Sequence, residues 1–258
     1  MARKIPVVFH VPHSSRKIPF RIKKQFLLKG RELKKELVLM TDSFTEDLYG
    51  TSQNAFRCVS KTSRLIVDVE RFPNDSEEVM SKVGMGVIYQ KTSDGKTLRK
   101  VPDERQRKAL LKKYYYRHHR RFEKLVEKCL GEKGFCLIID CHSFSSFRQK
   151  YEISEIKHRP EICIGTDPFH TEKWLEDLFV KSFSCAGFEV SLNTPFSGSI
   201  VPMKYYGKDK RVQSVMIEIR RDLYMNEKTG RRLKEYGALK KRLSLVLDEI
   251  MNKMVKAL

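Results

Sequence analysis

Short apolar runs of strand length recur along the chain, and charged segments with helical spacing lie between several of them. The runs occupy residues 6–11, 64–69, 135–139, 161–165, 188–192 and 214–219. Each is almost continuously apolar, which is typical of strands that are covered on both faces. The pattern therefore predicts a mostly parallel or mixed sheet buried between other layers.

Two long segments have the spacing of amphipathic helices. In residues 104–130 an apolar side chain recurs every three or four positions, and Lys and Arg fill much of the rest. Residues 232–255 repeat this spacing with Leu, Ile and Met on one stripe. Alternating strands and helices predict an α/β fold of three layers, with helices on both faces of the sheet.

No feature of the sequence divides the chain into separate units. It contains no internal repeat and no long Gly/Ser linker in its 258 residues, and single α/β domains of about 250 residues are ordinary. We therefore expect one domain over residues 1–258. Residues 72–101, which are rich in Pro, Asn and Gly turn signals, form the most irregular stretch, and we expect an excursion beside the functional site.

The strongly basic composition makes a polyanion one candidate partner. The chain has 52 Lys and Arg against 32 Asp and Glu, a formal net charge of +20, and such a charge attracts nucleic acid. The basic and aromatic segment 112–124 gives this alternative its best support. An amphipathic helix with a cationic outer face explains the segment as well, and no zinc-finger or RNA-recognition signature accompanies it.

The sequence has neither a membrane span nor a secretory pattern. No apolar run approaches the roughly 20 residues that cross a bilayer, and His10 interrupts the short apolar stretch near the N-terminus. The six cysteines form no Cys-x-x-Cys pair, which favours reduced, mostly buried thiols. We expect a cytoplasmic protein that does not bind membranes.

Polar side chains stand at or just beyond the ends of several apolar runs. His13 follows the first run, His142 follows the third, Glu218 lies near the end of the last, and Arg64 and Arg71 flank the second. Ligands of open α/β sheets bind at the carboxyl ends of strands, where such groups converge. Histidines, a carboxylate and arginines together suit metal-assisted hydrolysis.

Each histidine also has a simpler interpretation. A lone histidine such as His13 or His142 is more often structural than a metal ligand. Their position directly after apolar runs favours the ligand interpretation. We interpret His10 as a structural or supporting residue, and His118 and His119 as packing residues of a helix.

Six short segments together resemble the sequence marks of the N-formylglutamate amidohydrolase family. In chain order they are VPHSS (11–15), TDSFTEDLY (41–49), SRLIVDVER (63–71), DCHS (140–143), NTPFSGS (193–199) and IEIRRDLYM (217–225). Members of that family are distant relatives of zinc carboxypeptidases and succinylglutamate desuccinylases. The resemblance implies a phosphorylase/hydrolase-like fold and a zinc-dependent hydrolase that cleaves the linear amide of a small acidic N-acyl amino acid such as N-formylglutamate.

The resemblance also implies one divalent metal, most simply Zn²⁺, held by His13, Asp42 and His142. Three protein ligands with an open fourth position are typical of catalytic zinc. Glu46, one helical turn after Asp42, is the competing third ligand. Asp42 has a simpler interpretation too, as the N-cap of a short helix over residues 44–48.

The remaining matched residues would serve catalysis and substrate binding. Glu218 would be the general base that takes a proton from the attacking water and delivers it to the leaving nitrogen; an ion pair with Arg220 or Arg221 is the alternative. Arg64 and Arg71, which flank residues 65–69, would polarise the scissile carbonyl or clamp a substrate carboxylate, and we assign the first role to Arg64. Arg71 and Arg221 would clamp a substrate carboxylate, which suits the forked guanidinium.

Three positions depart from the family pattern. Glu70 and Arg220 replace asparagines, and Gly198-Ser199 replaces a pair of glycines. In the related carboxypeptidases the Asn-Arg pair holds a substrate carboxylate. We therefore expect Glu70 to weaken binding of an acidic substrate, and Glu70→Asn to improve binding of N-formylglutamate.

Overall fold

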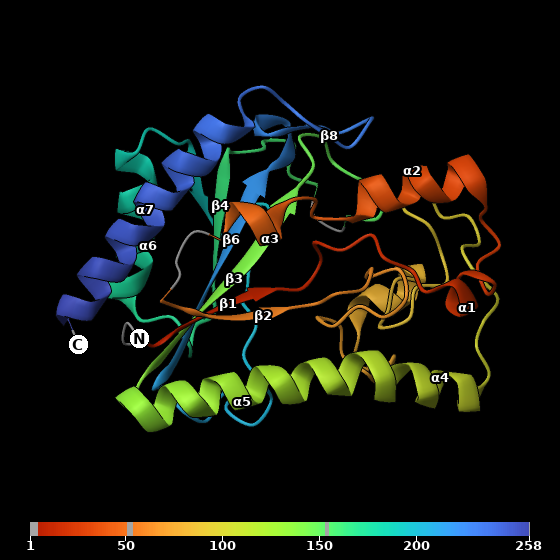
Figure 1. Ribbon diagram of the computed structural model, residues 1–258, viewed down its shortest axis with the longest axis horizontal. Coiled ribbons are helices and arrows are strands. Elements are labelled where there is room, and N and C mark those ends of the chain that lie inside the picture. The colour runs from red at the N-terminus through yellow and green to blue at the C-terminus, as the bar shows by residue number, and fades with distance from the viewer. Residues whose placement is uncertain (1–4, 51–53, 153–154, 258) are drawn as a thin grey trace.

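A six-stranded mixed sheet forms the centre of the computed structural model, which describes residues 5–50, 54–152 and 155–257 (Figure 1). Its strands are β1 (Val7–Val11), β2 (Phe56–Val59), β3 (Cys136–Phe144), β4 (Ile162–Thr166), β5 (Val190–Leu192) and β6 (Val212–Arg220), in the order β2-β1-β3-β6-β4-β5. All neighbouring pairs are parallel except β4 and β6. The predicted α/β class with a mostly parallel or mixed sheet is confirmed.

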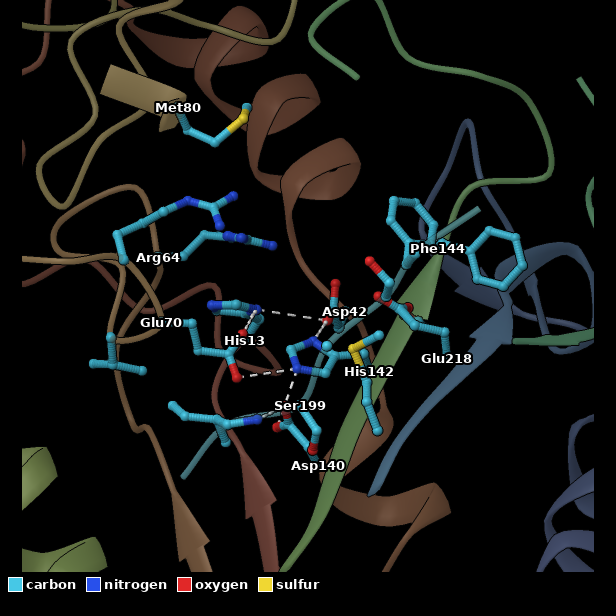
Figure 2. Close-up of a pocket in the computed structure, with 18 of the residues that line it drawn as sticks. His13, Asp42, Arg64, Glu70, Met80, Asp140, His142, Phe144, Ser199 and Glu218 are labelled. Atoms are coloured by element: carbon cyan, nitrogen blue, oxygen red, sulfur yellow. Dashed lines mark hydrogen bonds and ion pairs between the residues drawn. The ribbon is translucent and has the colours of Figure 1, made fainter. Parts of the chain in front are cut away.

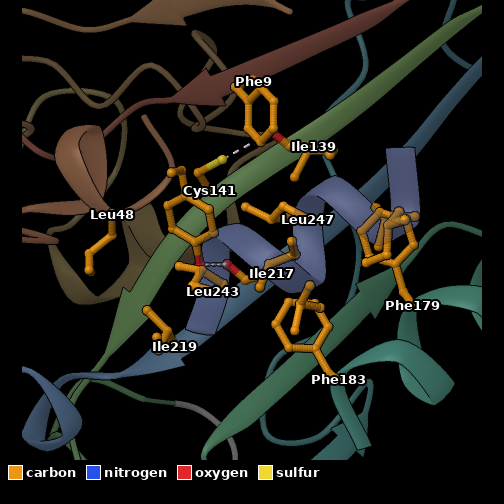
Figure 3. Close-up of a cluster of buried hydrophobic side chains, with 14 of the residues drawn as sticks. Phe9, Leu48, Ile139, Cys141, Phe179, Phe183, Ile217, Ile219, Leu243 and Leu247 are labelled. Atoms are coloured by element: carbon orange, nitrogen blue, oxygen red, sulfur yellow. Dashed lines mark hydrogen bonds between the residues drawn. The ribbon is translucent and has the colours of Figure 1, made fainter. Parts of the chain in front are cut away.

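Helices cover both faces of this sheet because successive strand residues point to opposite sides. Val7 and Phe9 pack into a core with α6 (Lys173–Cys185) and α7 (Tyr236–Ala257). Val8, between them, packs with α5 (Tyr116–Lys133) on the other face. Figure 3 shows the larger core, where Leu243 and Leu247 of α7 lie against the sheet.

Both predicted long helices are present. The first comprises α4 (Glu104–Leu110), a π-helical segment η2 (Leu111–Tyr115) and α5, in one continuous run. The second is α7. The shorter elements are α1 (Phe20–Lys23), α2 (Gly30–Met40), α3 (Thr45–Leu48), the 3₁₀ helices η1 (Val79–Val83) and η3 (Arg221–Leu223), and the hairpin β7 (Met225–Asn226) with β8 (Arg231–Arg232). None of the helices in the described ranges is long and apolar enough to cross a membrane.

One predicted strand is wrong. Residues 64–69 form turns rather than a strand, and the Asp68 N–H bonds to the Val87 carbonyl instead of to a neighbouring strand. Their apolar side chains are buried beneath the excursion, where Leu65 and Ile66 join two small clusters. The place beside β1 belongs to β2, which the sequence did not predict because Arg57 interrupts its apolar run.

The central strands β3 and β6 place two site residues side by side. They pair in parallel along nine residues each, with His142 aligned to Glu218. The predicted third strand was expected to stop before Asp140, yet β3 continues to Phe144, and all its residues are buried. His142 therefore projects from a strand held on both sides by the sheet, which fixes its position.

Candidate metal centre and active site

A cavity of about 610 Å³ opens at the carboxyl ends of β1, β3 and β6. All seven residues to which the sequence assigned site roles line it: His13, Asp42, Arg64, Arg71, His142, Glu218 and Arg221. Phe72 and Met80 of the excursion line it as well. Glu46 lies elsewhere, with a half-exposed carboxylate paired to Lys61 at 2.6 Å.

His13 presents one ring nitrogen to the centre of this site. Its Nε2 lies 2.8 Å from Asp68 Oδ1, so the carboxylate holds the proton on that nitrogen. Its Nδ1 is buried and lacks a hydrogen-bond partner in the described chain, with Glu70 Oε2 at 3.5 Å and Asp42 Oδ2 at 3.7 Å. A carboxylate behind a histidine whose other nitrogen is free is typical of metal ligation.

His142 lies among three carboxylates (Figure 2). Its Nδ1 is 3.1 Å from Asp42 Oδ2, and its Nε2 is 3.1 Å from both Glu70 Oε1 and Asp140 Oδ1. The same oxygen, Asp140 Oδ1, lies 2.9 Å from His10 Nδ1. Either nitrogen of His142 can therefore face a metal while the other donates a hydrogen bond to a carboxylate.

Two carboxylates can complete a set of three ligands. Asp42 uses Oδ1 for Arg221 Nη2 at 2.7 Å, which leaves Oδ2 directed towards both histidines. Glu70 offers the second set, since His13, Glu70 and His142 each have a ligand atom within 4.8 Å of the others. Sequence reasoning missed Glu70 as a ligand because it interpreted Glu70 as a replacement for the asparagine of the family's substrate clamp.

The cluster is strongly anionic. Burial tends to raise the pKa of Asp42 and Glu70, but the neighbouring histidines, and Arg221 beside Asp42, hold both pKa values below the ordinary range. Burial tends to lower the pKa of His142, yet Glu70, Asp140 and Asp42 raise it well above its usual value. Ionised carboxylates around histidine nitrogens form a donor set that fits a divalent cation.

Glu218 lies in the same cavity as this cluster, with one carboxyl oxygen unpartnered among the described residues. It is buried, and its Oε2 lacks a hydrogen bond in the described residues. Burial raises the pKa of Glu218 to about 8, although His142 opposes this shift. The ion pair considered from the sequence is not formed, because Arg220 pairs with Asp222 and Arg221 with Asp42.

The three arginines differ in how far their donors are used. Arg64 donates Nε and Nη2 to Asp68 at 3.0 and 2.7 Å. Arg221 donates to Asp42 and also to the carbonyls of Leu39 and Ser143. Arg71 only approaches carboxylates, at 3.9 Å from Asp68 and from Glu78. Among the described arginines of the cavity it is the one with both terminal nitrogens free, whereas Arg64 has one.

Buried histidines and carboxylates at strand ends of an α/β sheet, next to a buried glutamate, suit the hydrolase class and can hold a metal ion. The comparison with protein families agrees with this class. A family model described as N-formylglutamate amidohydrolase matches residues 5–225. The chain belongs to this family.

Individual relatives are distant in sequence and close in fold. N-formylglutamate deformylase of Pseudomonas aeruginosa is 22% identical over 235 residues, which cover 87% of this chain and 84% of that protein. The crystal structure of N-formylglutamate amidohydrolase from Ralstonia eutropha JMP134 matches with a TM-score of 0.86 and 20% identity, covering 100% of this chain and 96% of that one. A gene product of Agrobacterium tumefaciens matches with a TM-score of 0.66 and 20% identity, covering 96% and 93%.

Proposed function

We propose that the protein is a zinc-dependent amidohydrolase that cleaves the amide bond of an N-acyl amino acid. One observation carries the proposal: the unpartnered Nδ1 of buried His13 faces two ionised carboxylates, and the unpartnered Oε2 of Glu218 lies in the same cavity. A buried polar atom without a partner is costly. A bound cation and a reacting water would supply both missing partners.

His13, His142 and Asp42 would hold the metal, with Glu70 as the competing carboxylate. Nitrogen and oxygen donors in a set of three suit zinc. When bound, zinc supplies Lewis acidity to the amide carbonyl and lowers the pKa of water. Asp68, behind His13, and Asp140, beside Nε2 of His142, would orient the two rings.

Glu218 would act as the general base. Its free carboxylate oxygen would accept a proton from the attacking water and then deliver it to the leaving nitrogen. Arg64 has one terminal nitrogen left for the scissile carbonyl, and Arg71 can clamp a substrate carboxylate through two parallel hydrogen bonds. The contacts of Arg221 favour positioning of Asp42 over the clamp role expected from the sequence.

Metal analysis combined with an assay tests this proposal. The purified protein should contain about one zinc per chain and hydrolyse at least one N-formyl, N-acetyl or N-succinyl amino acid. His142→Ala should lose the metal while keeping a cooperative unfolding transition. A folded, metal-free wild type that binds nucleic acid and hydrolyses no N-acyl amino acid would instead support the polyanion-binding alternative.

A further inference from the structure

The cavity is large, and part of its lining is apolar. At about 610 Å³ it falls in the range of about 300–1,000 Å³ that is typical of sites for drug-sized molecules. Three large apolar side chains of its lining, Phe72, Met203 and Tyr206, remain 45%, 61% and 45% exposed. Exposed apolar groups gathered at one cavity indicate a surface that a ligand covers.

The cationic groups of the cavity can pair with one substrate carboxylate. Arg64 and Arg221 are already hydrogen-bonded to Asp68 and Asp42. Burial lowers the pKa of His119, which also lines the cavity, to about 4, so its ring is neutral. Among the described lining residues outside the metal cluster, Arg71 is the cation with both terminal nitrogens free, whereas Arg64 has one, which the proposed function assigns to the scissile carbonyl. Glutamate would bring two carboxylates.

Apolar groups lie next to this single clamp. Phe72 follows Arg71 in the chain, and both line the cavity. Glu78 joins both of these residues to Met80: its Oε1 lies 3.9 Å from Arg71 Nε and accepts a hydrogen bond from the Met80 N–H. Its Oε2 accepts a hydrogen bond from the Phe72 N–H. The half of a substrate that carries the clamped carboxylate would therefore meet Phe72 and Met80. A second carboxylate placed there would lose its water without gaining a partner.

We propose that the preferred substrate is the N-acyl derivative of an apolar amino acid, of the size of leucine, methionine or phenylalanine, and not of glutamate. Arg71 binds the single carboxylate of this substrate, and the apolar side chain of the substrate lies against Phe72 and Met80. This inference rests on the proposed amidohydrolase function and specifies the substrate class of the same site.

Kinetics with a matched set of N-formyl amino acids test the inference. The zinc-loaded protein should give a kcat/KM for N-formyl-methionine, -leucine or -phenylalanine that exceeds the value for N-formylglutamate by about 10–200-fold, the discrimination that apolar pockets usually achieve. N-formylglutamine, similar in size to the glutamate compound but with an uncharged side chain, should be at least as good as N-formylglutamate. A clear preference for glutamate over both glutamine and methionine would overturn the inference.

A substitution that adds a charge tests whether Met80 decides the preference for an apolar substrate side chain. Met80→Arg adds a second cation beside the clamp and should shift the ratio of kcat/KM for N-formylglutamate to N-formyl-methionine at least 10-fold towards glutamate. Val79→Arg is the matched control, because Val79 is 55% exposed, lies on the same 3₁₀ helix and does not line the cavity. An equal shift in both variants would show that general charge, and not the contact at Met80, decides the preference.

Binding of the free amino acids separates the two proposals. If the zinc-loaded protein hydrolyses no N-acyl amino acid, the proposed function fails. Calorimetry with methionine and glutamate then still tests the specificity of the cavity. Tighter binding of methionine, weakened by Arg71→Ala, supports the inference. Tighter binding of glutamate contradicts it.

Discussion

Asp68 decides which nitrogen of His13 faces the cavity. It is buried, and it accepts hydrogen bonds from His13, Arg64 and Tyr89. Burial tends to raise its pKa, but Arg64, His13 and Arg71 keep that pKa well below the ordinary value. The charged carboxylate would make the free Nδ1 of His13 a stronger metal ligand, so the proposed ligand would depend on a residue that does not itself contact the metal.

Replacing Asp68 should therefore weaken metal binding. Asp68→Asn keeps the size and an acceptor oxygen but removes the charge behind His13. Supporting residues of this kind contribute about 10–100-fold to metal affinity, and a loss of that size should appear in competition with a zinc chelator. Thermal unfolding is the control for the fold. An unchanged zinc affinity would show that Asp68 serves only the fold.

The third ligand can be assigned by comparing two isosteric variants. Asp42→Asn should lower zinc content more than Glu70→Gln, because Asp42 Oδ2 faces both histidines while Arg221 holds its other oxygen. Zinc per chain after dialysis is the measurement. The opposite order, with metal lost from Glu70→Gln and retained in Asp42→Asn, would make Glu70 the ligand.

At the scale of elements, the strands position the site residues. A group of polar contacts around Asp47, here called the polar tie, lies near Asp42. The short helix α3 begins three residues after Asp42, and its Asp47 accepts hydrogen bonds from Tyr236 and Lys240 of α7, both at 2.5 Å. Arg232 adds an ion pair at 3.1 Å. The polar tie joins the segment that carries Asp42 to the largest helix of the core.

Removing the polar tie should cost little stability and should change the response to acid. Asp47→Ala is expected to lower the free energy of unfolding by about 0.5–1 kcal/mol, because its carboxylate is partly exposed. Burial tends to raise the pKa of Asp47, but Lys240 and Tyr236 lower it below the usual value. The contribution is therefore present above the pKa of the unfolded chain and is lost as the pH falls through the folded pKa. Urea unfolding at pH 7 and pH 3 measures both effects; an equal loss at both pH values would contradict the ionic origin.

The elements also show what the sequence can and cannot predict. β1, β3 and β6 were predictable because a strand covered on both faces is continuously apolar, and His13, His142 and Glu218 followed from their ends. Residues 64–69 were misassigned because burial beneath a loop leaves the same apolar pattern. Asp42 depended on the family resemblance, since an aspartate before a short helix is equally typical of an N-cap. The role of Glu70 required the fold of its loop.

For the whole molecule, the metal should be a source of stability. The cavity is lined by the carboxylates of Asp42, Glu70 and Asp140, which a bound cation would bring into contact with a positive charge. Zinc at about 100 times its dissociation constant should add about 2.7 kcal/mol to the free energy of unfolding, if the unfolded chain does not bind it. Thermal unfolding with and without chelator measures this. The double variant His13→Ala/His142→Ala should show no such difference, and an equal difference there would place the stabilising metal elsewhere.

The turnover number of zinc-loaded Glu218→Gln tests the central claim most directly. The substitution keeps the shape of the side chain and removes its basic oxygen, and general base catalysis typically contributes about 10²–10⁴-fold. The kcat for an N-acyl amino acid should fall by about that factor while one zinc per chain remains bound. Near-normal turnover in the fully metallated variant would contradict the account of this cavity as an active site with Glu218 as its base.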